Sequence, residues 1–472
     1  MPRKEICWLS ALELTQGYTC GDFSPVDVLE EILGRVKRYN PELNAIVTVT
    51  EASARAAARK ADKDIKDGKK VGPLAGVPIT IKDLVHTKGV RTTFGSKLYE
   101  NYVPDEDAVL VERLKEAGAV IIGKTNVPEF GLIAYTDNQI FGPTRNPWDK
   151  SKTVGGSSGG AAAAVASGMG PIAHGNDGGG SVRIPPCFCS VYGMKPSFGR
   201  VPDYPGLQMW ETLNSDGPIT RTVSDAALTL DIMAGPDEKD RFSLPATGKK
   251  YLENVDKGIE DSKVAFSPNL GYAALDVEVE NLTRKASFSF EMLDCTVTEI
   301  KPDLPNMEND LVNLIIARTV AAIGNRLEEW KKVLYPYYSS FLALEPGMKA
   351  RDIIRIEYKR EELWKKMRKI FDEYDFLLTP VTAVPAFDIQ PNAAGTPSKI
   401  GGKGVGPIGW MPFTYPFNFT GQPAASIPIG FTSMGLPVGL QIVGERYDDL
   451  GVLKASRAYE KMHPWQNKRP PL

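Results

Sequence analysis

Two glycine-rich turns, each holding serine, mark the segment 155–186 as the place where this chain could do chemistry. The first turn sets Ser157 and Ser158 between pairs of glycines, and the second places Ser181 after three consecutive glycines. Glycine lets the backbone bend sharply and approach another group closely. Consecutive glycines before a serine also leave backbone N–H groups that can converge on one point, as in an oxyanion hole. The pattern therefore predicts acyl transfer with a serine nucleophile.

Lys82 is the candidate base for such a serine, because the apolar run at 76–81 predicts a strand that delivers this lysine at its end. Chemistry in open α/β sheets gathers at the carboxyl ends of strands. An exposed lysine is a poor base at neutral pH, but burial favours the neutral amine and lowers the lysine pKa. On residue type alone, a solvated lysine stays an open alternative. His174 is expected to be a core histidine and not the base of a Ser-His-Asp triad.

The elements that must position these residues alternate between helices and strands, which indicates an α/β fold. Ser24 and Pro25 favour the start of the first helix, and Pro41 is expected to end it. Helices are predicted near 24–40, 51–67, 107–117, 161–166, 220–233, 279–293, 309–333, 351–374 and 450–463. Strands are predicted near 76–81, 119–122, 171–173, 296–300, 375–380, 424–429 and 438–443, with the last two expected to pair.

Two irregular stretches, 128–148 and 380–416, are expected to serve a site as loops. Loops of this length inside a compact domain usually carry function. The later stretch is rich in proline and glycine and is expected to cover a pocket.

Composition excludes several classes of partner. The formal net charge of −2 gives no electrostatic reason to expect nucleic acid or an anionic membrane. No uncharged run reads as a transmembrane helix and no secretory signal is recognised, so a cytoplasmic protein is expected. The five cysteines are expected to be buried free thiols, with Cys187 and Cys189 too closely spaced for a zinc pair. No metal and no organic cofactor are expected.

The combination of Lys82, the GGSSGG turn with Ser157, and the turn from Gly179 to Arg183 resembles the amidase signature family. The resemblance implies a single α/β/α domain over 1–472, built around a large twisted mixed β-sheet. Within it, the expected parts are a signature core at 70–230, a variable substrate-pocket segment at 237–376 and a return to the sheet at 377–472. Further blocks that resemble the family lie at 123–126, 141–148, 193–196, 217–220 and 420–424.

The resemblance also implies roles for individual residues. Ser181 would be the nucleophile, Ser157 would follow a cis peptide bond and relay protons, and Lys82 would be the base. The other implied roles are an oxyanion hole of the N–H groups of Gly178, Gly179, Gly180 and Ser181, supporting contacts from Ser158, Asp177 and Arg183, and a substrate-binding lining by Gly131, Leu132 and Ile133.

The chain departs from the family pattern at two points. Asn176 stands where the family commonly carries threonine or serine, and Gly178 replaces a bulkier residue, which is expected to widen the acyl pocket. Ile184 follows Arg183, whereas the glutaminase subunits of tRNA-dependent amidotransferases tend to carry glutamine there.

We therefore expect hydrolysis of a carboxylic amide through an acyl-enzyme, with an ester or a carbamate as further possible substrates. The alternative is the role of such a glutaminase.

The expected partner is a small-molecule amide, with a homodimer as an open alternative for the assembly. The aromatic and aliphatic residues of the variable segment and the late loop favour an uncharged, hydrophobic substrate, such as an aryl or alkyl acylamide or a nylon-like oligomer. The candidate pocket side chains are Trp210, Ile315, Ile316, Tyr335, Tyr337, Tyr338, Trp410 and Phe413.

Overall fold

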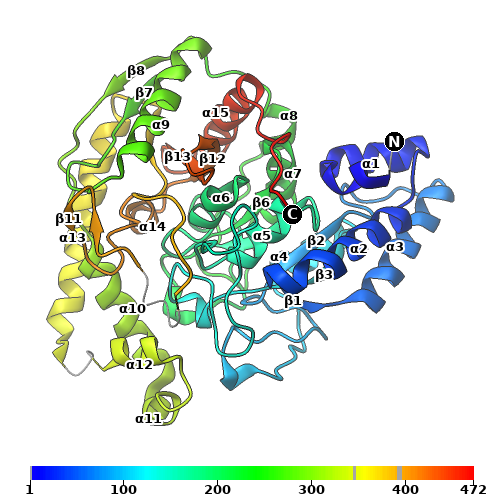
Figure 1. The fold of residues 1–472 in the computed structure, drawn as a ribbon, viewed down its shortest axis with the longest axis horizontal. Coiled ribbons are helices and arrows are strands. Elements are labelled where there is room, and N and C mark those ends of the chain that lie inside the picture. Colours follow the sequence, from blue (N-terminus) through cyan, green and yellow to red (C-terminus); the bar gives the residue numbers. More distant parts are fainter. Residues whose placement is uncertain (1–2, 344–346, 391–395) are drawn as a thin grey trace.

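The centre of the fold is a mixed β-sheet (Figure 1), and the computed structural model describes residues 3–343, 347–390 and 396–472. Within these ranges the sheet has 11 strands. From one edge to the other they are β1 (Ile46–Val49), β3 (Val120–Thr125), β2 (Pro78–Lys82), β4 (Ile172–Asn176), β6 (Asp216–Thr220), β5 (Tyr192–Lys195), β12 (Ala424–Phe431), β13 (Pro437–Gly444), β9 (Phe376–Pro380), β7 (Lys263–Phe266) and β8 (Thr296–Glu299).

The sheet combines parallel and antiparallel pairs. β2 runs parallel to both β3 and β4, and β7 runs parallel to β8 and β9. β12 and β13 pair antiparallel with each other, which confirms the pairing expected for the two late strands. Because β12 also pairs with β5, the early and late parts of the chain share one sheet.

Helices cover both faces of the sheet, as alternate residues of β12 show. Ala425 belongs to the same buried apolar cluster as Val452 of α15, whereas Ala424 belongs to a second cluster with Ile184 of α6. The predicted α/β architecture is therefore confirmed. The helices are α1 (Ala11–Cys20), α2 (Pro25–Leu43), α3 (Glu51–Lys66), α4 (Val109–Glu116), α5 (Gly159–Ala166), α6 (Ile184–Cys189), α7 (Val223–Met233), α8 (Tyr251–Asn254), α9 (Val277–Phe288), α10 (Glu308–Ile323), α11 (Leu327–Trp330), α12 (Pro336–Leu342), α13 (Ala350–Phe371), α14 (Pro416–Thr420) and α15 (Asp449–Met462).

Two predicted helix boundaries are wrong. Pro41 does not end α2, which continues to Leu43 and stops at Asn44 in the left-handed region with φ 52°. The helix predicted over 309–333 is interrupted at Gly324, whose φ of 59° and ψ of −136° end α10 before α11 begins. Glycine adopts such a conformation without steric cost, so the break coincides with the one residue type that tolerates it.

The stretch 380–416 contains a small hairpin formed by β10 (Lys399–Ile400) and β11 (Lys403–Gly404). Its residues 391–395 lie outside the described residues. The rest of the stretch reaches α14, which brings the late loop next to the glycine-rich turns described below.

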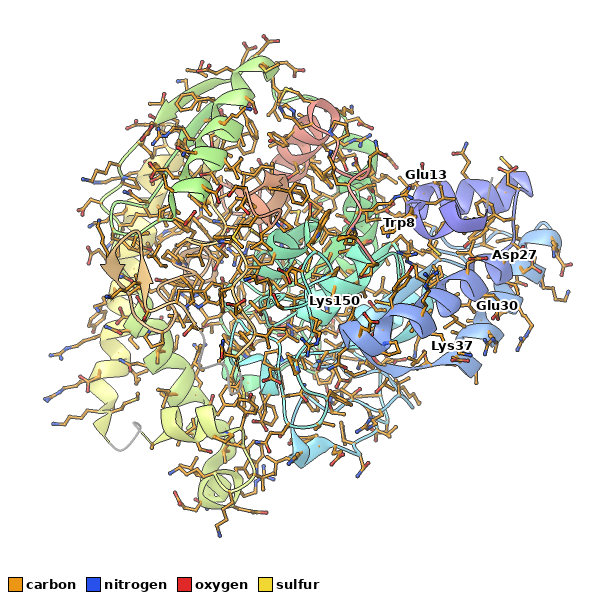
Figure 2. The ribbon with its side chains drawn as sticks, viewed as in Figure 1. Trp8, Glu13, Asp27, Glu30, Lys37 and Lys150 are labelled. Atoms are coloured by element: carbon orange, nitrogen blue, oxygen red, sulfur yellow. The ribbon has the colours of Figure 1, made fainter. Side chains whose placement is uncertain are left out.

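The N-terminal helices form one edge of the molecule, where Figure 2 labels the charged side chains of Glu30 and Lys37 on α2. Glu30 pairs with Arg55 of α3 at 2.7 Å, an exposed contact of the kind that contributes little stability. On the inner side, the Trp8 ring lies 5.8 Å from the Arg221 guanidinium. Across the described ranges, none of the helices combines the length and the hydropathy that a membrane span requires.

Candidate active site

Lys82 is the last residue of β2, and its side chain is fully buried. Its Nζ lies 2.8 Å from Ser157 Oγ and donates to two oxygens of Asn176, the backbone carbonyl at 3.1 Å and Oδ1 at 2.5 Å. Burial lowers the pKa of Lys82 to about 7, although the negative charges of Asp177 and Asp216 act in the opposite direction. The alternative of a solvated lysine is therefore wrong, and this amine can accept a proton near neutral pH.

Ser157 lies between Lys82 and Ser181. Its Oγ is 3.0 Å from Ser181 Oγ, and the Gly156–Ser157 peptide bond is cis, as the resemblance implied. Gly156 has no room for a side chain, since a Cβ there would lie 2.5 Å from the backbone nitrogen of Tyr135. The two serines are 3% and 7% exposed, so the lysine and both hydroxyls form one continuous chain of buried polar groups.

The helix behind Ser157 is built from small residues because it packs against backbone. α5 starts directly after Ser158, and all of its residues are buried. A Cβ at Gly160 would lie only 2.3 Å from the backbone nitrogen of Asn126. Ser158 Oγ donates to the carbonyl of Asn176 at 3.3 Å, which gives this serine the supporting contact that the resemblance implied.

The loop that carries Ser181 is folded around the carboxylate of Asp177. One oxygen of this carboxylate accepts from the backbone N–H of Gly180 at 2.7 Å. The Gly180 N–H is therefore already used, which corrects the expectation that it belongs to an oxyanion hole. The backbone N–H groups of the loop that have no acceptor among the described residues are those of Gly178, Gly179 and Ser181.

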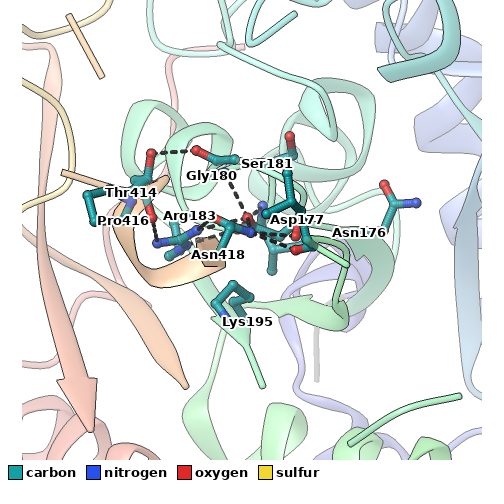
Figure 3. Close-up of polar contacts among 12 residues, drawn as sticks. Asn176, Asp177, Gly180, Ser181, Arg183, Lys195, Thr414, Pro416 and Asn418 are labelled. Atoms are coloured by element: carbon teal, nitrogen blue, oxygen red, sulfur yellow. Dashed lines mark hydrogen bonds and ion pairs between the residues drawn. The ribbon is translucent and has the colours of Figure 1, made fainter. Parts of the chain in front are cut away.

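Arg183 holds Asp177 through hydrogen bonds from Nε at 2.9 Å and Nη2 at 2.8 Å (Figure 3). The same guanidinium donates to the Thr414 carbonyl and to Asn418 Oδ1, both at 2.7 Å. Burial alone would raise the pKa of Asp177, but the charge and hydrogen bonds of Arg183 outweigh it and lower the pKa to about 2. The expected Asp177–Arg183 pair is confirmed, and it ties the Ser181 loop to the late part of the chain.

Thr414 and Asn418 are site residues that the sequence did not single out. Thr414 Oγ1 donates to the Gly179 carbonyl at 2.7 Å, and Asn418 Nδ2 donates to the Asp177 carbonyl at 2.7 Å. Both stand in the otherwise aromatic and proline-containing run 410–419. A polar residue buried in such a run needs a hydrogen-bond partner, and this signal could have pointed to them.

His174 is separate from this chain of groups. Its Nε2 lies 2.9 Å from Asp216 Oδ1, and both side chains are buried. Burial, helped by the positive charges of Lys82 and Lys124, lowers the pKa of His174 to about 3. Burial also raises the pKa of Asp216 to about 7. The prediction of a core histidine is confirmed.

An apolar cavity of about 80 Å³ lies against Ser181 and Gly179. The irregular stretch 128–148 supplies one wall of this cavity, and α10 supplies another. Among the described lining residues there is no acidic or basic side chain. The predicted lining residues that the cavity contains are Gly131, Leu132, Ile133, Trp210, Ile315, Ile316 and Tyr338.

Three other predicted pocket side chains do not line this cavity. Trp410 and Phe413 belong to a buried apolar cluster that also holds Phe188. Tyr335 is buried, and its hydroxyl donates to Asp137 Oδ2 at 2.6 Å. Their apolar or aromatic character therefore reflects the core and not a binding surface. The side chain of Tyr337 lies outside the described part of the chain.

Gly178 does not widen the cavity. A Cβ at this position would lie 2.2 Å from Cε3 of Trp210, so the indole already fills the space that a side chain would take. The indole N–H donates to the Phe130 carbonyl at 3.1 Å, which holds the ring in place. The expected widening is wrong, and Trp210 instead forms part of the cavity wall.

All five cysteines are free. Cys7, Cys187, Cys189 and Cys295 are buried as expected, whereas Cys20 is exposed. Burial raises the pKa of Cys187 to about 12, which keeps this thiol protonated and unreactive.

Three kinds of comparison with known proteins, by family model, by sequence and by structure, all match this chain to amidases and their relatives. A family model described as Amidase matches residues 27–453. The acylamidase of Rhodococcus erythropolis is 37% identical, and the match covers 100% of this chain and 98% of that protein. A glutamyl-tRNA(Gln) amidotransferase subunit from Carboxydothermus hydrogenoformans is 35% identical over 99% of this chain and 100% of its own length. The solved structure of a bacterial aryl acylamidase of the amidase signature enzymes matches with a TM-score of 0.91 and 32% identity, covering 97% of each chain.

Proposed function

The chain belongs to the amidase signature family and is an amide hydrolase, and we propose that it cleaves uncharged, apolar amides through an acyl-enzyme on Ser181. One observation carries this proposal, namely that the chain of polar atoms from Lys82 through Ser157 to Ser181 ends at the apolar cavity. A base, a relay and a nucleophile are thus within hydrogen-bonding distance of one another.

Acylation begins when neutral Lys82 takes the proton of the Ser157 hydroxyl while Ser157 takes that of Ser181. Ser181 Oγ forms a bond to the carbonyl carbon of the amide, and the π electrons of the carbonyl move onto its oxygen. The N–H groups of Gly178, Gly179 and Ser181, which have no acceptor among the described residues, would hold this oxyanion. Removing one such donor costs about 3 kcal/mol in other acyl-transfer enzymes.

The same groups then return the proton. The Lys82 ammonium protonates Ser157, and Ser157 protonates the leaving nitrogen as the C–N bond breaks and an ester forms on Ser181. In the second half of the cycle, water forms a bond to the ester carbonyl carbon while Lys82 takes its proton through Ser157. The bond from that carbon to Ser181 Oγ then breaks, the carboxylic acid leaves, and the proton returns from the Lys82 ammonium through Ser157 to Ser181 Oγ. Each half-reaction ends with neutral Lys82, so the enzyme gains and loses no proton over the cycle.

The substrate we propose is an aryl or alkyl acylamide or a nylon-like oligomer. A charged group would lose its hydration in this cavity without meeting an opposite charge, which is costly. The similarity to an acylamidase and to an aryl acylamidase supports the same class. An ester or carbamate of similar shape would enter the same acylation step.

A fluorophosphonate probe, read out by intact-protein mass spectrometry, tests the nucleophile. We expect one adduct on the wild type and on the exposed-serine control Ser53→Ala, and none on Ser181→Ala. Labelling that persists in Ser181→Ala would contradict the assignment of Ser181 as the nucleophile.

Turnover of anilides, aliphatic amides and glutamine then tests the substrate class, and activity confined to glutamine would overturn the proposed class.

The glutaminase subunit of a tRNA-dependent amidotransferase is the second candidate, because relatives of that description match nearly the whole chain. Ile184 after Arg183 argues against this role, since those subunits tend to carry glutamine at that position. Copurification of partner proteins together with glutamine-only turnover would favour the second candidate over the first.

A further inference from the structure

Two of the three oxygen atoms around the Lys82 amine belong to one residue, Asn176. Asn176 ends β4 and immediately precedes the loop that carries Ser181. Both its carbonyl oxygen and its side-chain Oδ1 accept from Nζ, at 3.1 and 2.5 Å. Figure 3 shows the Asn176 side chain pointing away from the Asp177–Arg183 pair. This side chain therefore contacts the lysine and not the ion pair that holds the loop.

The number of hydrogens on these atoms determines how the neutral amine is oriented. A neutral amine has two N–H groups and one lone pair, whereas a carbonyl oxygen only accepts. Both N–H groups must point at Asn176, because one of its oxygens would otherwise face the lone pair. The lone pair is then directed at Ser157 Oγ, 2.8 Å from Nζ, whose hydroxyl can donate to it. When the amine takes up a proton, the new N–H points at the same oxygen.

We propose that Asn176 is a positioning residue that directs the lone pair of Lys82 toward Ser157, so that protons enter and leave the lysine along the triad. This role rests on the proposed function, because it concerns the base that activates Ser181. A serine or threonine, which the family commonly carries here, has a hydroxyl that can donate to the lone pair and occupy it. The amide oxygen of Asn176 cannot do so.

Asn176 contributes this orientation without adding a charge, although charged groups lie close by. An aspartate has the same shape as asparagine and would place one negative charge against the amine. The titratable and charged groups around Lys82 are Asp177 with its partner Arg183, Asp216 with His174, and Lys124 with Asp83.

The first test is the pH dependence of kcat/KM for an anilide in Asn176→Asp, with folding checked by circular dichroism. An opposite charge within about 4–6 Å favours the charged form of a group and moves its pKa by roughly one to three units. We expect the acid limb of the profile to move upward by at least about one pH unit, with activity recovering at higher pH. A purely structural defect would lower the rate without moving the limb. An acid limb at the wild-type pH would overturn the proposal.

The second test is Asn176→Ala, which removes the acceptor and adds no charge. The amine can then rotate away from Ser157, so we expect kcat to fall about tenfold or more at every pH, as small misplacements of reacting groups do. The acid limb should move to lower pH, because the ammonium loses an acceptor. A kcat within about twofold of the wild type would overturn the proposal.

Lys82→Met separates a failure of this inference from a failure of the proposed function. If Lys82→Met retains activity with the wild-type acid limb, the lysine is not the base and the proposed function fails. If Lys82→Met is inactive while Asn176→Asp keeps the wild-type limb, only the role of Asn176 fails.

Discussion

The protonation state of Lys82 depends on two opposing effects: burial favours the neutral amine, and two nearby carboxylates favour the ammonium. Burial lowers its pKa to about 7 against the pull of Asp177 and Asp216. Asp177 is paired with Arg183 at 2.8 Å and supports the Ser181 loop, so changing it would alter several contacts at once. Asp216 lies on β6 against His174, which makes it the carboxylate whose charge can be removed with the least disturbance of the loop.

Asp216→Asn is expected to move the acid limb of kcat/KM to lower pH by less than about one unit, because Asp216 carries its negative charge mainly above about pH 7. Without this negative charge the ammonium form of Lys82 loses a stabilising interaction, so the lysine stays neutral to lower pH. A pH–rate profile with an anilide measures the shift. Asp256→Asn, an exposed carboxylate, is the matched control. An upward shift, or an equal shift in the control, would contradict this account.

The reacting residues could be predicted from the sequence, and so could the supports Ser158, Asp177 and Arg183, whereas the contacts made by more distant segments could not. Ser157 and Ser181 stand in glycine-rich turns, and Lys82 follows an apolar run, so each carries a local signal. The partners of Asn418 and Trp210 could not be predicted, because they lie far away in the chain. Their contacts with Asp177 and Gly178 exist only once the sheet brings the segments together.

At the level of elements, α14 supports the Ser181 loop through Asn418. This side chain donates to the Asp177 carbonyl and accepts from Arg183, each at 2.7 Å. Removing it leaves buried polar groups without partners, and each such group costs about 1–3 kcal/mol. The loop that presents the nucleophile therefore depends on a helix more than two hundred residues later in the chain.

Asn418→Ala is expected to lower the free energy of unfolding by about 2 kcal/mol, measured by thermal or urea unfolding. Fluorophosphonate labelling of Ser181 should slow as well, because the loop loses its support. The exposed residue Asn101 provides the control Asn101→Ala, for which neither quantity should change. Wild-type stability and labelling in Asn418→Ala would show that α14 does not support the loop.

The contact between the glycine loop and Trp210 is expected to set the size of the group that the cavity accepts. In Trp210→Ala, kcat/KM for a bulky anilide relative to acetanilide should rise about tenfold, because the indole no longer occupies the wall. Gly178→Ala should lower activity, because its new Cβ would lie 2.2 Å from Cε3 of the indole and force the ring aside. Trp210→Ala should relieve that loss. Losses that simply add in the double variant would show that the two residues act independently.

Long amphipathic helices were the elements most readily predicted, and short strands the least. α3 and α13 agree closely with their predicted ranges because many residues contribute to the helical period. Of the strands with 4 residues, β8 was predicted, whereas β1, β5 and β7 were not. A strand of that length offers too few alternations to stand out, and its identity comes from its neighbours in the sheet.

At the level of the whole molecule, one sheet joins segments from both halves of the chain. β5 lies beside β12, and the Asp177–Arg183 pair contacts α14. We propose that residues 1–472 form one folding unit for this reason. Scanning calorimetry should show a single unfolding transition, with Ser181 labelling lost at the same temperature. Two separated transitions would contradict a single unit.

The most direct measurement of the central claim is the rate of Ser181 acylation as a function of pH, followed by rapid quench and mass spectrometry with an anilide substrate. Because Lys82 must be neutral to accept a proton and has a pKa of about 7, the rate should rise with pH through a single ionisation near pH 7. In Lys82→Met this dependence should disappear together with nearly all of the rate. A rate that does not change between about pH 5 and pH 9, or an ionisation that persists in Lys82→Met, would contradict the account.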